Sequence, residues 1–388
     1  MSGNVLYEIF ILFLSILLAP IVSRISKIPV IVIEIIFGII LGGSFLCFLG
    51  YSDWLSAMAL IGFIYLMFVV GLEVDFALLK SHFLKVILIT FGSLFTPFLL
   101  GFFVAILFDL PPLFIGVALS TTSMGVILPT IKELDTSEEF NNVLLGSAIL
   151  VDIISMFALA FIIEEEILST DRLVLLMLTL VCSLLGIYLL KRTSLVEKIT
   201  LCGREYHFDV RLSLALIFGF AILAEFVGVH AILGSFFAGL FISEFEERVE
   251  GLIEKLLSFG YGFFIPVFFI SVGVRTDISI IFTSLENLGI LAALLLAGFL
   301  GKFFGTSLIA KYIGFDKYES MSMGFAMSAR LSLIIAAAEL GLATGIIGVD
   351  IYSVFVLLAI SSILLSPSLA KLVIGRRAVV IKEESAVL

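Results

Sequence analysis

GSAILVDIISMFALA, residues 146–160, places a lone acid, Asp152, near the middle of an apolar run over residues 141–163. A run of that length crosses a bilayer as an α-helix. A carboxylate at mid-membrane depth costs about 2.5–3.5 kcal/mol on insertion scales, because burial disfavours its charged form. We therefore expect Asp152 to be protonated, paired or bound to a cation. The alternative is an acid that only makes structural hydrogen bonds inside a helix bundle.

The composition excludes a soluble globular protein. Of the 388 residues, 61% are hydrophobic and 14% charged, and the mean hydropathy is +1.27. Apolar runs recur along the whole chain, so we expect an all-α, multi-pass protein of the lipid bilayer. The net charge of −10 argues against nucleic-acid binding. No nucleophile–base–oxyanion constellation and no metal-ligand spacing of Cys or His is found, so we predict neither an enzyme nor a cofactor.

The apolar segments number about thirteen. They cover residues 4–22, 29–46, 56–72, 83–108, 112–131, 140–163, 173–190, 208–227, 230–243, 256–273, 284–310, 318–341 and 350–374. The positive-inside rule then sets the orientation. With the N-terminus outside and the C-terminus cytoplasmic, nearly all of the 22 Lys and Arg residues are inside, and the outer loops hold only Arg172 and Arg275. Lys302 and Arg330 fall within apolar segments.

Two short matches indicate an internal repeat. GLEVD (71–75) is similar to GVRTD (273–277), and GVALS (116–120) is similar to GFAMS (324–328). The two offsets are alike and span an odd number of predicted helices, so the two halves have opposite orientations in the membrane. Inverted repeats are typical of secondary transporters, whose substrate site lies near the membrane midplane where the repeats meet.

Each repeated segment is expected to contain a broken helix. In LSTTSMGVILP (119–129), the four consecutive hydroxyl residues are Ser120, Thr121, Thr122 and Ser123. Hydroxyl side chains compete for backbone hydrogen bonds, and Pro129 removes one, so carbonyls and half-helix ends would face a cavity and could meet an ion. The second copy, residues 324–333, should break around Ser328. The alternative is a continuous helix whose hydroxyls bond to the preceding turn.

Two cations lie at membrane depth. Lys302 is preceded by a long run of apolar and small residues, so it must find a partner or lose its proton. It could balance the negative C-terminal ends of the broken helices, pair with an acid, or act as a structural tether. For Arg330 we favour a structural or gating salt bridge. Both residues are predicted to balance charge in the core.

Motifs along nearly the whole chain resemble those of the monovalent cation:proton antiporter superfamily, specifically its second branch. They are KIPVIVIEIIFGIILGGS (27–44), FVVGLEVD (68–75), LSTTSMGVILP (119–129), AEFVGVHAILGSFFAGL (224–240), GFFIPVFFISVGVRTD (262–277) and GKFFG (301–305). The last of these places Lys302 where relatives carry a membrane lysine. The resemblance implies about thirteen helices in two inverted six-helix repeats, with two broken helices crossing beside the aspartate.

The resemblance also implies which parts of the chain form the panel and which form the core. Panel helices lie within 1–75 and 208–273, core helices within 83–163 and 284–374, a linking helix at 173–190 and a cytoplasmic tail at 375–388. Asp152 binds Na⁺ and couples it to the proton, helped by Thr121, Thr122, the neighbouring hydroxyls and backbone carbonyls. The core moves like an elevator, and the panel forms a homodimer. The implied function is exchange of a monovalent cation for H⁺ across the cell membrane in pH homeostasis, and we favour Na⁺ as the cation.

Three departures from the family pattern qualify these expectations. Relatives carry Asp-Asp or Asn-Asp where this chain has Val151-Asp152, so we favour electroneutral exchange of one proton per cation. Arg330 is followed by Leu-Ser rather than Gly-Glu, and no nucleotide-binding tail follows Lys382. The open alternatives are transport of K⁺ or Li⁺, a K⁺/H⁺ exchanger or K⁺ efflux carrier, a sodium-coupled organic-anion symporter, and a channel or sensor.

Overall fold

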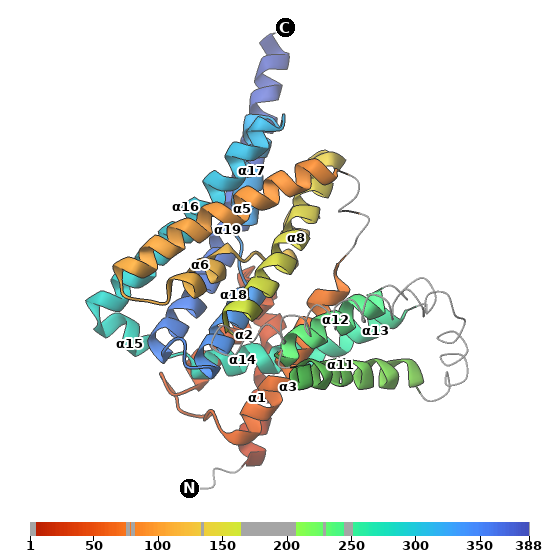
Figure 1. Cartoon of the computed structure of the whole chain (residues 1–388), viewed down its shortest axis with the longest axis vertical. Coiled ribbons are helices and arrows are strands. Elements are labelled where there is room, and N and C mark those ends of the chain that lie inside the picture. The colour runs from red at the N-terminus through yellow and green to blue at the C-terminus, as the bar shows by residue number, and fades with distance from the viewer. Residues whose placement is uncertain are drawn as a thin grey trace. The chain divides into compact units, whose positions relative to one another are not determined.

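The computed structural model describes residues 5–74, 78, 82–132, 136–163, 207–227, 230–243 and 251–387. Within this part every regular element is helical, and no strand is drawn in Figure 1. Nine helical stretches of the described residues are long and apolar enough to cross a membrane. The expected all-α, multi-pass fold is therefore confirmed. The expected linking helix at 173–190 lies outside the described residues.

The chain forms two compact units, each built from two separate segments. The first comprises Met1–Val74 and Glu164–Arg275, and the second Asp75–Ile163 and Thr276–Leu388. In the first unit the described helices are α1 (Val5–Ser26), α2 (Val30–Leu41), α3 (Asp53–Leu72), α11 (Phe208–Val227), α12 (Ala231–Ser243), α13 (Leu252–Phe259), the π-helical turn η3 (Gly260–Phe264) and α14 (Ile265–Arg275). In the second they are α5 (Phe83–Leu107), α6 (Pro112–Ser120), α7 (Met124–Lys132), α8 (Glu138–Ile163), α15 (Ile278–Thr283), α16 (Leu285–Tyr312), α17 (Lys317–Met327), α18 (Ser332–Ala343) and α19 (Val349–Val387).

The first unit contains two matching close contacts between glycines. A Cβ on Gly273 of α14 would lie 2.8 Å from Cα of Gly38 on α2. A Cβ on Gly239 of α12 would lie at the same distance from Cα of Gly71 on α3. Small residues allow membrane helices this close approach. Going about 200 residues along the chain takes α2 to α12 and α3 to α14. The α2–α14 contact therefore corresponds to the α12–α3 contact, as expected for an internal repeat.

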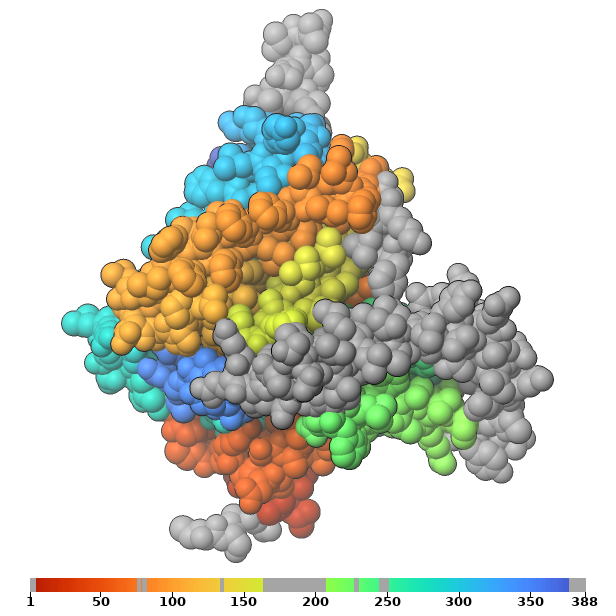
Figure 2. All heavy atoms as spheres, viewed as in Figure 1, coloured from red at the N-terminus to blue at the C-terminus, as the bar shows by residue number. Residues whose placement is uncertain are grey.

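In the second unit, small residues also bring α5 against α16. A Cβ on Gly305 would lie 2.2 Å from the carbonyl oxygen of Gly92, and one on Gly301 would lie 2.6 Å from Cα of Pro97. The two helices are therefore antiparallel, and the residues beside these glycines, Ser93 and Lys302, come to the same level. On its other side α5 packs along α8, and Figure 2 shows these two helices side by side on one face.

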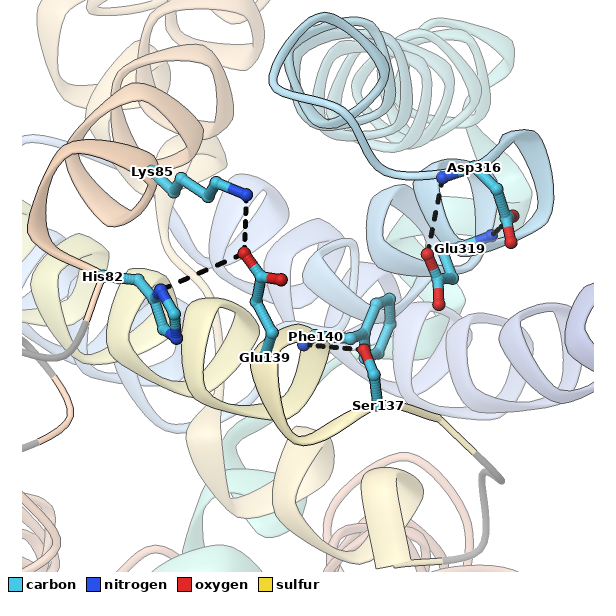
Figure 3. Close-up of polar contacts among 7 residues, drawn as sticks. All are labelled: His82, Lys85, Ser137, Glu139, Phe140, Asp316 and Glu319. Atoms are coloured by element: carbon cyan, nitrogen blue, oxygen red, sulfur yellow. Dashed lines mark hydrogen bonds and ion pairs between the residues drawn. The ribbon is translucent and has the colours of Figure 1, made fainter.

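Polar contacts lie at the first turns of α8 and α17, as Figure 3 shows. Glu139, in the first turn of α8, accepts a hydrogen bond of 2.5 Å from the Lys85 ammonium, and Nδ1 of His82 lies 3.9 Å from the same oxygen. Asp316 caps α17 by accepting a bond from the backbone N–H of Glu319, whose side chain accepts one from the Asp316 N–H. A carboxylate in the first turn of α8 also suits the positive end of the helix dipole.

Candidate functional site

The first broken helix lies where the hydroxyl run predicts it. α6 ends at Ser120 and α7 begins at Met124, leaving Thr121–Ser123 outside either helix. The Ser120 hydroxyl donates to a carbonyl one turn back (2.8 Å), and the Thr121 hydroxyl to the Ala118 carbonyl (2.8 Å). The Thr121 hydroxyl occupies the carbonyl that a continuing helix would offer to the N–H of Thr122, whereas the Ser120 bond is of a kind also found inside unbroken helices of this chain. The proline does not cause the break, because Pro129 lies inside α7.

The second broken helix interrupts the repeated segment as expected. α17 ends at Met327 and α18 begins at Ser332, and the Ser328 hydroxyl donates to the Gly324 carbonyl (2.9 Å). The first half of each broken helix contacts the second half of the other, α6 with α18 and α17 with α7. The two interruptions therefore lie together in the second unit.

Arg330, within the second break, ties the two interruptions to each other. It is 1% exposed, and its guanidinium donates to the carbonyls of Leu119 (2.9 Å), Ser328 (3.2 Å) and Gly298 (2.5 Å). Leu119 is at the C-terminal end of α6 and Ser328 caps α17, so one buried cation faces the negative ends of both half-helices. The salt bridge expected for Arg330 is not found among the described residues, since carbonyls take the place of an acid.

Lys302 lies in the middle of α16 and is fully buried. Its ammonium donates to the hydroxyls of Ser93 on α5 (2.9 Å) and Thr122 in the first break (2.5 Å). The charges of Arg330 and Asp152 both act on it. Lys302 thus connects α5 with the hydroxyl run of the first break.

Asp152 is on α8, more than half-way along the helix, and its side chain is 6% exposed. That exposure excludes an acid turned toward lipid. The preceding residue, Val151, is fully buried in an apolar cluster with Ile127 of α7 and Met327 of α17. α8 packs on α6 and on α18, one half of each broken helix. The acid therefore lies in the same unit as both interruptions and within electrostatic reach of Lys302.

The buried side chains of this region offer oxygen donors. No group of three His, Cys, Asp or Glu side chains within the described ranges is placed to hold a metal ion. Instead, one carboxylate lies in the unit that holds four buried hydroxyls, those of Ser120, Thr121, Thr122 and Ser123. The hydroxyl of Ser123 has no hydrogen-bond partner in the described part of the chain. Small hard cations prefer oxygen ligands of this kind.

Comparison with known proteins identifies the family. Residues 13–373 match the family described as "Sodium/hydrogen exchanger, transmembrane". The chain belongs to this exchanger family.

Individual relatives agree with this family assignment. The exchanger is 30% identical over 375 residues to the "Probable Na(+)/H(+) antiporter 3" of Methanocaldococcus jannaschii, covering 94% of this chain and 96% of that protein. It is 27% identical over 398 residues to the "Na(+)/H(+)-K(+) antiporter GerN" of Bacillus cereus, covering 97% and 98%. Its fold is similar to that of the sodium proton antiporter MjNhaP1 from M. jannaschii, with a TM-score of 0.67 at 17% identity, over 95% of this chain and 98% of that one.

Some residues of the candidate site have no signal in the sequence. Ser93 is one of several small polar residues in the apolar segment 83–108, and nothing singles it out. The carbonyls of Leu119 and Gly298 bind Arg330 through backbone atoms that a sequence pattern does not reveal. One sequence signal does exist for the helix contact beside Lys302. Gly301 and Gly305 have the spacing of small residues that is typical of closely packed membrane helices.

Proposed function

We propose that this exchanger carries Na⁺ in one direction and H⁺ in the other by letting both compete for Asp152. The observation that carries the proposal is a nearly buried carboxylate in a membrane helix, packed on halves of two broken helices and within reach of Lys302. Family membership supports it, as do the printed names of the relatives.

The mechanism follows from the cost of a bare buried charge. When protons are abundant Asp152 is neutral and releases its cation, and when they are scarce the carboxylate is charged and rebinds one. An ionised, empty Asp152 is expensive to carry through the membrane interior. Only the loaded forms therefore cross readily, and this produces exchange.

The hydroxyl run supplies the remaining ligands in this proposal. Ser123 is the best placed, because its buried hydroxyl has no hydrogen-bond partner in the described ranges. The hydroxyls of Ser120 and Thr121 donate to helix carbonyls, and their oxygen lone pairs can still face an ion. Thr122 accepts from Lys302, so its contribution depends on where that ammonium lies.

The two buried cations have separate roles in the proposed cycle. Arg330 stabilises the negative ends of α6 and α17. Lys302 holds the Thr122 hydroxyl and favours the charged form of Asp152 that binds the cation. Because position 151 is a valine, Asp152 has no acidic or amide neighbour at the preceding position. We therefore propose one proton per monovalent cation, an electroneutral stoichiometry.

Larger-scale features of the cycle are also proposals. The second unit, with Asp152 and both broken helices, is the moving core of an elevator, and the first unit is the panel of a homodimer. We propose that the exchanger lies in the cell membrane with its N-terminus outside and its C-terminus cytoplasmic, in accordance with the distribution of Lys and Arg.

K⁺ is the second candidate cation, because the name of the Bacillus cereus relative includes K⁺.

Flux through purified protein in liposomes tests the proposal. A pH-sensitive dye inside the vesicles reports proton movement when Na⁺, Li⁺, K⁺ or choline is added outside, with the membrane potential clamped. Wild type should respond to Na⁺ and not to choline, and Asp152→Asn should not respond while eluting as a folded protein. Glu139→Gln removes an acid from the exposed end of the same helix and should exchange like wild type. Substantial Na⁺-driven proton flux by Asp152→Asn would refute the proposal.

A further inference from the structure

Ser155 is a second polar residue on the Asp152 face of α8. It follows Asp152 by three positions, and residues at that spacing lie next to each other on a helix surface. Its side chain is 1% exposed, and its hydroxyl has no hydrogen-bond partner within the described ranges. Nothing in the mechanism above uses it.

Many buried hydroxyls in the described helices behave differently, although those of Thr306, Ser307 and Ser366, like that of Ser155, have no partner within the described ranges. Those with a partner mostly donate to a carbonyl of their own helix three or four residues back. Examples are Ser15, Ser120, Thr130, Ser235, Ser271, Ser328 and Ser362. On α8 itself, the Ser147 hydroxyl donates to the Val86 carbonyl of α5 (3.3 Å). Ser155 uses neither arrangement, although leaving a buried hydroxyl without a partner costs free energy.

The surroundings of Asp152 on α8 point to one use for this hydroxyl. On the N-terminal side, Val151 and Ala148 are fully buried in an apolar cluster and offer no side-chain oxygen. On the C-terminal side, Ser155 offers a neutral oxygen one turn away. A carboxylate and a hydroxyl at this spacing can hold one small cation between them, since such ions take several oxygen ligands.

We propose that the Ser155 hydroxyl is a ligand of the transported cation and sets the affinity of the exchanger for it. This inference deepens the proposed function and rests on it, because it assumes that Asp152 binds the cation. Ser155 binds the ion equally before and during its passage. Removing the hydroxyl therefore raises KM for the cation and leaves kcat nearly unchanged.

The test is the KM of Ser155→Ala for Na⁺ in the liposome assay. We expect KM to rise roughly tenfold, the loss of one charge-assisted contact, with kcat within about twofold of wild type. Ser155→Thr keeps the oxygen and should keep KM near the wild-type value. Ser147→Ala, the matched control, removes a buried serine of the same helix that already has a partner, and should leave KM unchanged. A wild-type KM in Ser155→Ala overturns the inference, as does a fall in kcat alone.

A second measurement keeps the inference testable if Ser155→Ala does not fold. Ser155→Cys keeps the shape and replaces the hard oxygen with sulfur, so its KM for Na⁺ should also rise. A ligand that binds the folded protein stabilises it, so Na⁺ should raise the melting temperature of Ser155→Thr and do so less for Ser155→Cys. Equal KM and equal Na⁺ stabilisation in these two variants would overturn the inference. Active Asp152→Asn would instead refute the proposed function itself, which distinguishes the two failures.

Discussion

Replacing Arg330 with methionine is expected to destabilise the second unit strongly. The change removes three hydrogen bonds from a 1% exposed guanidinium and leaves the carbonyls of Leu119, Ser328 and Gly298 buried without that donor. Each bond to a charged group contributes about 1.5–3 kcal/mol, but bonds that share one side chain do not add fully. Each buried carbonyl left without a donor costs about 1–3 kcal/mol, and because the three losses do not add fully we expect a total of about 3–5 kcal/mol.

The assay is thermal melting of the purified protein in detergent. A loss of this size corresponds to a fall in melting temperature of roughly 6 °C or more for a unit of about 200 residues. Arg330→Lys keeps the charge but cannot reach three carbonyls with one ammonium, so it should recover only part of the loss. Arg275→Met removes a guanidinium that stacks on the Tyr51 ring, and should shift the melt far less. If Arg330→Met melted within about 2 °C of wild type, the role of Arg330 as a tie between the two breaks would be refuted.

Further substitutions test other parts of the site. Gly305→Ala should lower the melting temperature, because a Cβ there would lie 2.2 Å from a backbone oxygen of α5, whereas Gly219→Ala, in open space, should not. Thr122→Val removes an acceptor of Lys302 and should reduce exchange in liposomes, while Thr122→Ser should retain it. Lys302→Met should impair exchange more than Thr122→Val, since it removes the ammonium itself. Glu139→Gln breaks an ion pair whose acid is 43% exposed and should change stability by less than about 1 kcal/mol, as measured by the same melt.

Much of the fold could be predicted from local signals. The run of apolar segments predicts the helices, and the four consecutive hydroxyls at 120–123 predict the first break, where the Thr121 hydroxyl bonds a carbonyl that a continuing helix would need. The repeat then placed the second break near Ser328, where α17 ends. The burial of Asp152 also followed, since an acid in the middle of an apolar helix avoids lipid.

The pairing of the buried cations could not be predicted. Balance of the half-helix ends was considered for Lys302, and the structure places Arg330 against both of them. Lys302 instead donates to Ser93 and Thr122. Lys302 reaches Ser93 because of the way α5 and α16 are aligned along their length. The close contact of Gly92 with Gly305 sets that alignment. Such a contact joins residues more than 200 positions apart, and a single sequence does not reveal it.

The central claim is that one carboxylate, Asp152, receives either a proton or a cation. The most direct test is the KM of wild-type exchanger for Na⁺, measured in liposomes across the acidic range with equal pH on both sides. Competition at one acid predicts that KM rises about tenfold for each unit of falling pH, with an unchanged maximal rate once Na⁺ saturates. A KM that does not vary with pH, or a maximal rate that protons suppress at saturating Na⁺, would contradict the account.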